Sequence, residues 1–304
     1  MASRRQYKRR YNKKGSLIST VIVIIVCIIW VLVERGCDST KKATPKPQAL
    51  DNTDTQVYFV DVGQGDATLV TSDGHNMLID TGERDDKNTL IHFLEEHDIQ
   101  SLDYLIISHP HTDHMGEASD ILKQFDTKTI IMPRTGSNIP TNSTYKYYLQ
   151  TVKKLNKRIT AATDTQLSLG KMTVNLFTSK KQHEDLNNYS VLVKLTHGEN
   201  SFLITGDCEV EEEAEMVEQG FDLSADVLRA GHHGSYKSSY NFFLEEVNPS
   251  YAVISCGKDN MYGHPHEQAV QRLKSFADHY YCTMTDGTIT FSSDGKGLTV
   301  NTEK

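Results

Sequence analysis

Short apolar stretches alternate with polar, glycine-containing turns from Gln56 to the end of the chain. The segments VYFVDV, ATLVTS and NMLID, separated by turns with glycine, are typical of short strands in hairpins. The pattern predicts strands at 57–62, 67–72, 76–80, 102–108, 128–132, 172–177, 190–196, 201–205, 225–229, 250–254 and 288–292, and helices at 87–97, 115–125, 144–155, 209–218, 239–246 and 266–276. Because the strands occur both in hairpins and in alternation with helices, we expect an α/β fold with two mixed β-sheets and outer helices.

A different apolar run, LISTVIVIIVCIIWVLV, occupies residues 17–33 and contains no charge. A membrane-spanning helix needs roughly 17–25 apolar residues, and the basic residues before the run favour a cytoplasmic N-terminus. A buried core helix, a cleaved signal peptide and a lipoprotein site at Cys37 are alternatives, but Glu34 and Arg35 suit neither kind of cleavage site. We predict a basic cytoplasmic tail (1–16), a single transmembrane anchor (17–33), a polar linker (34–55) and an extracellular domain (56–304).

Charge is divided unevenly along the chain. Residues 1–33 hold seven basic residues and no acidic one, so the net charge of −8 leaves −15 for residues 34–304. Such an acidic body repels polyanions at long range, which argues against a general DNA-binding surface but not against a small phosphate site. The five cysteines show no CxxC pair, and their odd number indicates buried free thiols rather than a disulfide framework.

The strongest chemical signal is the segment HPHTDH at residues 109–114, which follows a predicted buried strand and precedes a predicted helix. Three imidazoles and a carboxylate within six residues can converge on one point at a strand end. Neutral imidazole and carboxylate groups suit zinc, manganese or iron. His109 and His111 alternate, so they share one face of an extended segment, whereas Asp113 and His114 turn toward a second position.

The HxHxDH pattern after a strand is the signature of the metallo-β-lactamase superfamily, and the chain resembles the extracellular hydrolase domain of ComEC-type competence proteins. The resemblance rests on segments in the family's order: FVDVGQGDA (59–67), LIDTG (78–82), HPHTDH (109–114), NNYS (187–190), LITGD (203–207), GHHGS (231–235) and YGHP (262–265). It implies a hydrolase with an αββα sandwich, in which two mixed β-sheets are flanked by helices. The competence proteins also carry a multi-helix channel, whereas this chain shows one apolar span. We therefore expect the hydrolase chemistry, not DNA translocation by this chain alone.

The resemblance also implies a centre with two divalent metal ions, zinc or manganese. His109 and His111 would hold the first ion, and Asp113 and His114 would hold the second. Asp207, which follows the apolar strand SFLIT and a glycine, would bridge both ions.

Two ligand positions stay open. One histidine of the GHHGS segment would complete the second site. His233 is favoured, and His232 would then contact the substrate or orient a ligand. Many superfamily members place a further histidine for the first ion between HxHxDH and the bridging aspartate. In this chain His183 and His197 fall in that interval without a ligand motif, so we expect the first ion to have two histidines, the bridging aspartate and an open position.

Further polar residues of the matching segments are candidates for contacts to the ligands or the substrate, namely Asp66, Asp80, Asn188, Ser190, Ser235 and His264. Asp66 and Asp80 are each either a plain turn residue or an acceptor for a ligand imidazole. His264 precedes Pro265 at a predicted helix start, and either begins that helix or contacts the substrate and donates a proton. With Asp113, it is a candidate catalytic residue.

Two metal ions about 3.5–4 Å apart can activate a shared water for displacement at phosphorus. We therefore predict a membrane-anchored extracellular hydrolase, foremost a phosphodiesterase or nuclease with single-stranded DNA as a candidate substrate. Two alternatives stay open. One is a hydrolase of cell-wall or teichoic-acid phosphodiesters, and the other is a metal-binding but inactive surface module that recruits an unknown protein partner. A lactone, thioester or amide substrate would also suit such a centre.

Overall fold

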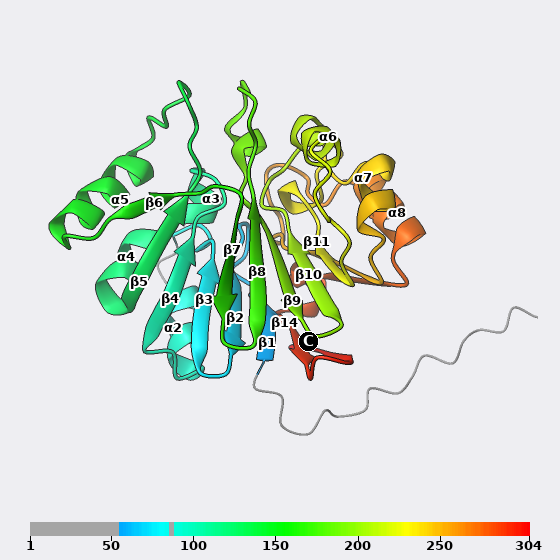
Figure 1. Ribbon diagram of the computed structural model, residues 1–304, viewed down its shortest axis with the longest axis horizontal. Coiled ribbons are helices and arrows are strands. Elements are labelled where there is room, and N and C mark those ends of the chain that lie inside the picture. The colour runs from blue at the N-terminus through cyan, green and yellow to red at the C-terminus, as the bar shows by residue number, and fades with distance from the viewer. Residues whose placement is uncertain (1–54, 85–87) are drawn as a thin grey trace, which may run out of the picture. The chain divides into compact units, whose positions relative to one another are not determined.

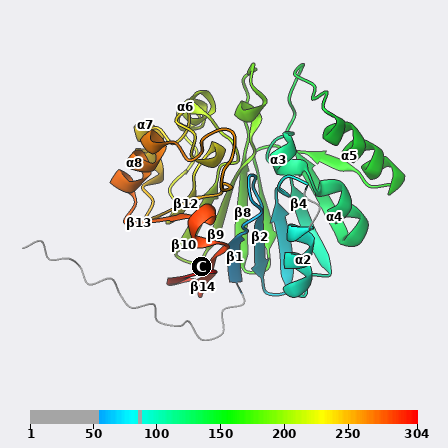
Figure 2. The same cartoon turned by 180° about the vertical axis from the view of Figure 1, so that it is seen from behind.

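Two β-sheets with helices on their outer faces make up residues 55–84 and 88–304, which the computed structural model describes (Figure 1, Figure 2). In this part of the chain, sheet A has the strand order β15 (Leu298–Thr302), β14 (Ile289–Ser293), β1 (Thr55–Phe59), β2 (Thr68–Ser72), β3 (His75–Ile79), β4 (Ser101–Ile106), β5 (Asp126–Met132) and β6 (Ile159–Ala161). Sheet B has the order β13 (His279–Cys282), β12 (Tyr251–Ile254), β11 (Val227–Arg229), β10 (Asn200–Ile204), β9 (Leu192–His197), β8 (Met172–Phe177) and β7 (Thr165–Leu169). Both sheets contain parallel and antiparallel pairs, so the predicted pair of mixed sheets is confirmed.

The helices fall into one set for each sheet, as both views show. The set on sheet A comprises α2 (Thr89–Glu96), α4 (Ala118–Gln124) and α5 (Ser143–Lys154), and the set on sheet B comprises α6 (Val210–Glu218), α7 (Asn241–Val247) and α8 (Glu267–Phe276). Short helical turns connect the strands elsewhere: α3 (Thr112–Met115), η1 (Leu186–Tyr189), η2 (His232–Gly234) and α9 (Thr283–Asp286).

Alternation along the strands divides the apolar side chains between the layers. Val57 and Phe59 of β1 lie in the core between the two sheets, whereas Tyr58 and Val60 pack beneath the helices of sheet A. Successive side chains of a strand point to opposite faces. A strand that is covered on both faces therefore reads as a continuous apolar run. This packing produces the predicted αββα sandwich.

All predicted strands and helices have counterparts, but the helix predicted at 115–125 begins later than expected, at Ala118 of α4. The segment forms two helices, α3 and α4, which are separated at Gly116 and Glu117. Gly116 packs against the loop after β3, where an added Cβ would lie 2.3 Å from Arg84 N and 2.6 Å from Gly82 O. A residue with a side chain would clash there, so this crossing of two chain segments requires glycine.

The structure also contains strands that the apolar pattern did not predict, namely β6, β7, β13 and β15. Within the described chain these strands occupy the four edges of the two sheets. An edge strand has a partner on one side only and is short or polar in many proteins. Its apolar signal is correspondingly weak, as in TQLSL of β7 and LTVNT of β15.

In the described ranges, no helix is long and apolar enough to cross a membrane. The predicted tail, the anchor at 17–33 and all but the last residue of the linker lie outside those ranges. The expected buried free thiols are confirmed for Cys208, Cys256 and Cys282. Cys27 and Cys37 lie outside the described residues.

Candidate metal centre

The residues singled out in the sequence lie in loops that follow parallel strands. β3 and β4 are parallel, so Asp80 and the 109–114 segment leave sheet A at the same edge. β10 and β11 are parallel, so Asp207 and the 231–235 turn leave sheet B in the same way. The loops of the two sheets meet around the Asp207 side chain.

The Asp207 carboxylate lies between two pairs of imidazole rings. Its Oδ1 atom is 3.0 Å from His114 Nε2 and 3.6 Å from His233 Nε2. Its Oδ2 atom is 3.8 Å from His109 Nε2 and 3.7 Å from His232 Nε2. Each carboxylate oxygen therefore faces a different pair of histidines.

Two pairs of ring nitrogens, His114 with His233 and His109 with His111, have the spacing of ligands around one ion. Two nitrogens at about 2.0–2.1 Å from a tetrahedral zinc ion lie roughly 3.3 Å apart. His114 Nε2 is 3.3 Å from His233 Nε2, and His109 Nε2 is 3.1 Å from His111 Nδ1. Both distances match that expectation.

A cation fits the Oδ1 side by the chemistry of its atoms as well. Asp113, His114, Asp207 and His233 offer ligand atoms that all lie within 4.8 Å of one another. Among the described residues, the buried Asp207 Oδ1 atom has no hydrogen-bond partner. A carboxylate oxygen is costly to bury without a partner, and a bound cation would supply one.

Partners on the far side of two rings determine which nitrogen faces the centre. His114 Nδ1 donates to Asp80 Oδ2 at 2.8 Å, and His233 Nδ1 donates to the Ser255 carbonyl at 2.9 Å. In the neutral form of each ring the Nε2 lone pair then faces Asp207, which is the tautomer that a metal ligand needs. Of the two roles open to Asp80 in the sequence, the structure gives it that of acceptor for an imidazole.

Asp66 has a different contact from the one expected. It pairs with the guanidinium of the fully buried Arg229, and no hydrogen bond joins it to a histidine ring. Asp66, Asp80 and His114 nevertheless offer atoms within 4.8 Å of one another, so the role of Asp66 toward a ligand imidazole stays a prediction. Arg229 was not singled out in the sequence, although a basic residue within the apolar segment VLRA indicates a buried charge.

Burial and neighbouring charges shift the pKa values of the groups around Asp207. Burial, followed by the positive charge of His114, lowers the pKa of His109 well below its ordinary value, so its ring stays neutral. Burial alone would raise the pKa of Asp207. The charges of His114, His233 and His232 outweigh that effect and lower this pKa well below its usual range. Burial alone would lower the pKa of His114, but the charges of Asp207 and Asp80 raise it well above its ordinary value. Metal ligation requires a neutral imidazole, so a cation that binds here would displace the proton of that ring.

An open pocket of about 370 Å³ lies over the centre. It is lined by Gln64, His111, Thr112, Asp113, Asn142, Asn187, Asp207, His232, His233, Tyr262 and His264. Burial, then the charges of His233 and His232, lower the pKa of His264 to about 4. The His264 ring stacks on Tyr262 with centroids 5.7 Å apart. Gln64, Asn142 and Tyr262 were not singled out in the sequence, because pocket-lining loops carry no periodic pattern.

The remaining candidates support the loops around the centre. Ser190 Oγ accepts a hydrogen bond from Asp207 N at 3.0 Å, and Asn188 Oδ1 accepts one from Glu209 N at 3.1 Å. Ser235 is buried in the 231–235 turn, where its N–H donates to the His232 carbonyl at 2.8 Å. These three residues hold the backbone that carries Asp207 and His232, and they do not line the pocket.

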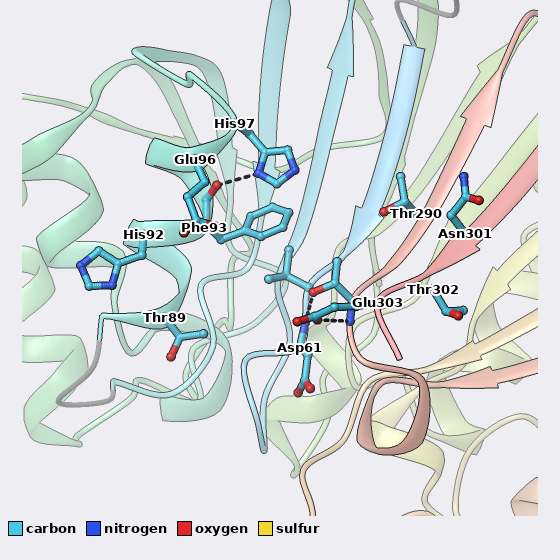
Figure 3. Close-up of a pocket in the computed structure, with 12 residues that line it drawn as sticks. Asp61, Thr89, His92, Phe93, Glu96, His97, Thr290, Asn301, Thr302 and Glu303 are labelled. Carbon is cyan, nitrogen blue, oxygen red and sulfur yellow. Dashed lines mark hydrogen bonds between the residues drawn. The ribbon is translucent and has the colours of Figure 1, made fainter. Parts of the chain in front are cut away.

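A larger cavity of about 560 Å³ lies between α2 and the strands β14 and β15 (Figure 3). Phe93 and His97 of the α2 region face Thr290 and Asn301 of the strands in this view, with Asp61 and Glu303 below them. Of the residues that the structure describes, the clusters able to hold a metal ion belong to the histidine centre and include no residue of this cavity. The larger volume of this cavity therefore does not identify it as the catalytic site.

Comparison with known proteins agrees with this geometry. The family model described as "Metallo-beta-lactamase superfamily" matches residues 60–258. The chain belongs to the metallo-β-lactamase superfamily. The solved metallo-β-lactamase-fold protein YhfI of Bacillus subtilis shares the fold, with a TM-score of 0.51, 15% identity, and coverage of 78% of this chain and 100% of that one. The diiron β-hydroxylase CmlA of Streptomyces venezuelae is similar at a TM-score of 0.53 and 13% identity, covering 80% of this chain and 55% of CmlA.

The expected resemblance to competence proteins is also confirmed. This superfamily member is 30% identical to ComE operon protein 3 of Bacillus subtilis over 256 residues, which are 78% of this chain and 33% of that protein. It is 30% identical to Recombination protein 2 of Haemophilus influenzae over 239 residues, which are 77% of this chain and 28% of that protein. The chain thus spans about a third of the length of these relatives.

Proposed function

We propose that residues 56–304 form a metal-dependent phosphodiesterase whose centre takes two divalent ions, zinc or manganese. The observation that carries the proposal is the position of Asp207, whose two oxygens face two separate sets of imidazole nitrogens. His109 and His111 would serve the first ion, and Asp113, His114 and His233 the second. Imidazole and carboxylate are ligands that suit both metals.

The pocket residues have distinct roles in this proposal. Two ions about 3.5–4 Å apart would lower the pKa of a shared water and stabilise an in-line displacement at phosphorus. Asp113 lines the pocket, and its low pKa keeps the carboxylate ionised and able to orient the attacking water. Burial alone would raise that pKa, but the hydrogen bond from His233 and the charge of His114 lower it. His264 is neutral at pH 7, so it offers the substrate a hydrogen bond rather than a proton.

The relatives and the charge of the chain narrow the substrate class. One of the relatives is named Recombination protein 2, which favours a DNA phosphodiester for this chain as well. The net charge of −15 beyond residue 33 disfavours a broad polyanion surface, so recognition would depend on local donors such as Asn142 and Asn187 in the pocket. A cell-wall phosphodiester remains the second candidate.

The experiment uses the full chain in detergent, with its metal content measured. Activity is assayed with Mn²⁺ or Zn²⁺ against a chromogenic phosphodiester, single-stranded DNA, teichoic acid and a thioester. We expect hydrolysis of the chromogenic phosphodiester and single-stranded DNA that disappears in Asp207→Asn. Cleavage of teichoic acid alone would favour the cell-wall alternative. A metal-loaded protein inert toward every phosphodiester would contradict the proposal and favour the inactive surface module.

We also propose that residues 17–33 anchor the protein in the cell membrane with the hydrolase domain outside. The support is the uncharged run and the seven basic residues before it. Protease added to intact cells should remove the chain beyond residue 34 and spare the tail. Protection of the C-terminal domain would reverse this orientation.

A further inference from the structure

The first metal position lacks the third histidine found in many superfamily members. The two histidines in the expected interval lie elsewhere in the structure. His183 Nε2 lies 3.1 Å from Glu215 Oε2 and 2.7 Å from Ser179 Oγ. His197 Nδ1 lies 2.9 Å from Ser293 Oγ, near the end of β14. Neither residue borders the pocket over the centre.

The geometry places His232 where that ligand is missing. Its Nε2 atom is 3.7 Å from Asp207 Oδ2, and His109 Nε2 is 3.8 Å from the same oxygen. His232 and His111 both line the pocket, as do Asp113 and His233 on the Oδ1 side. The His109 and His232 rings therefore approach the same carboxylate oxygen at similar distances, and His111 Nδ1 lies 3.1 Å from His109 Nε2.

The orientation of the His232 ring supports a ligand role. Its Nδ1 atom donates to Glu209 Oε1 at 2.9 Å, which leaves the Nε2 lone pair toward Asp207. Lys237 Nζ lies 3.3 Å from the same Glu209 oxygen and helps to hold that carboxylate in place. An imidazole with a carboxylate on its far nitrogen is a recurring arrangement among metal ligands.

Backbone conformation explains how neighbouring histidines serve opposite sides of Asp207. In an extended strand adjacent side chains alternate, so two neighbouring histidines are not expected to reach the same ion. His232 and His233 instead both have left-handed backbone, with φ of 49° and 53°. Their ring centroids lie 6.1 Å apart at an interplanar angle of 70°. His233 thereby reaches Oδ1 while His232 reaches Oδ2.

We propose that His232 is the third histidine ligand of the first metal, so that the GHHGS turn supplies one histidine to each ion. This inference rests on the proposed metal pair. It replaces the expectation that His232 contacts the substrate or orients a ligand. It also means that a single turn determines how far apart the two ions lie.

The test measures metal stoichiometry and spin coupling in the full chain loaded with Mn²⁺. Wild type should bind two ions per chain with an exchange-coupled EPR spectrum. His232→Ala should bind one ion with the spectrum of an isolated Mn²⁺. The double variant His111→Ala/His232→Ala should also bind one ion, because both substitutions affect the same metal position. His232→Ala/His233→Ala should bind none. His197→Ala is the matched control and should keep both coupled ions.

A milder variant keeps the test valid if a truncation impairs folding. Glu209→Gln should weaken the first ion roughly 10–100-fold and leave the affinity of the second unchanged. Two coupled ions of unchanged affinity in His232→Ala would overturn the assignment of His232 alone. A wild-type chain that binds no pair of ions would reject the proposed function itself.

Discussion

The two halves of the domain bring ligands to Asp207 in different ways. The sheet A half supplies His109, His111, Asp113 and His114 from one stretch after β4. The sheet B half supplies its ligands from two loops, after β10 and after β11. The conformation of a contiguous segment depends mainly on the strand end before it and on close packing of the chain at a glycine after it. Separated loops must be held by contacts across the fold.

The residues that hold the ligands in place also differ between the two halves. Behind the HxHxDH segment, the buried carboxylate of Asp80 accepts from His114 Nδ1 and from Ser108. Behind the sheet B ligands lies a set of buried charged residues, namely Arg229, Glu209, Glu212, Glu213 and Glu215. Buried charge is destabilising unless it is paired. Damage to the sheet B half should therefore affect folding as well as metal binding, and the following experiments test that difference.

The largest effect should come from Asp207→Ala, because its carboxylate faces both sets of ligands. Both ions should be lost, and activity should fall by more than the roughly 10–100-fold expected from losing an outer partner. Metal analysis and a phosphodiesterase assay measure the two effects. Asp222→Ala, at an exposed aspartate of the same half, is the control. Full occupancy and activity in Asp207→Ala would show that the bridging assignment is wrong.

Arg229→Met should destabilise the domain by about 3–5 kcal/mol, because Asp66 would remain buried without its cation. Urea unfolding of the metal-free protein measures the change without a contribution from metal binding. Adding Asp66→Asn to Arg229→Met should recover part of the loss, since the uncompensated charge is gone. A loss below about 1 kcal/mol would mean that the pair contributes no more than an exposed one.

Asp80→Asn tests the buried carboxylate behind the sheet A ligands. It should lower metal affinity or activity roughly 10–100-fold, because His114 loses the acceptor that orients its ring. The free energy of unfolding should change less than in Arg229→Met, and this is the contrast that the two halves predict. Isothermal titration with Zn²⁺ and urea unfolding measure the two quantities. A larger loss of stability in Asp80→Asn would invert the comparison.

The smallest effect concerns Glu213, beneath the sheet B ligands. Burial raises its pKa to about 8, although the N–H groups of Tyr240 and Ser239 act in the opposite direction. A folded pKa above the ordinary 4.5 means that its contribution to stability is present at low pH and is lost as pH rises toward and through 8. Between pH 7 and pH 8 the loss should be about 1 kcal/mol.

Unfolding measured across this pH range should show a shallower decline in Glu213→Gln than in wild type. Glu218→Gln, at an exposed position of the same helix, should keep the wild-type slope. Equal slopes in all three proteins would mean that Glu213 ionises in the folded state as freely as in the unfolded chain.

Much of the fold was readable from the sequence, because strands covered on both faces must be apolar at nearly every position. VYFV and SFLI are examples, and both became central strands. The edge strands β6, β7, β13 and β15 were missed for the converse reason, since one partner and partial exposure demand little of their sequence. The break at Gly116 was missed because it depends on the distant loop at 82–84, which no local pattern contains.

The sequence by itself determined the chemistry of the HxHxDH segment, since its ligand types and spacing lie within six consecutive residues. Only the tertiary structure decided which atoms share a side of Asp207. The left-handed backbone at His232 and His233 turns two adjacent rings toward different oxygens, against the alternation of an extended segment. Arg229 was likewise assigned by the fold, because a buried cation is tolerated only where another segment brings it a carboxylate such as Asp66.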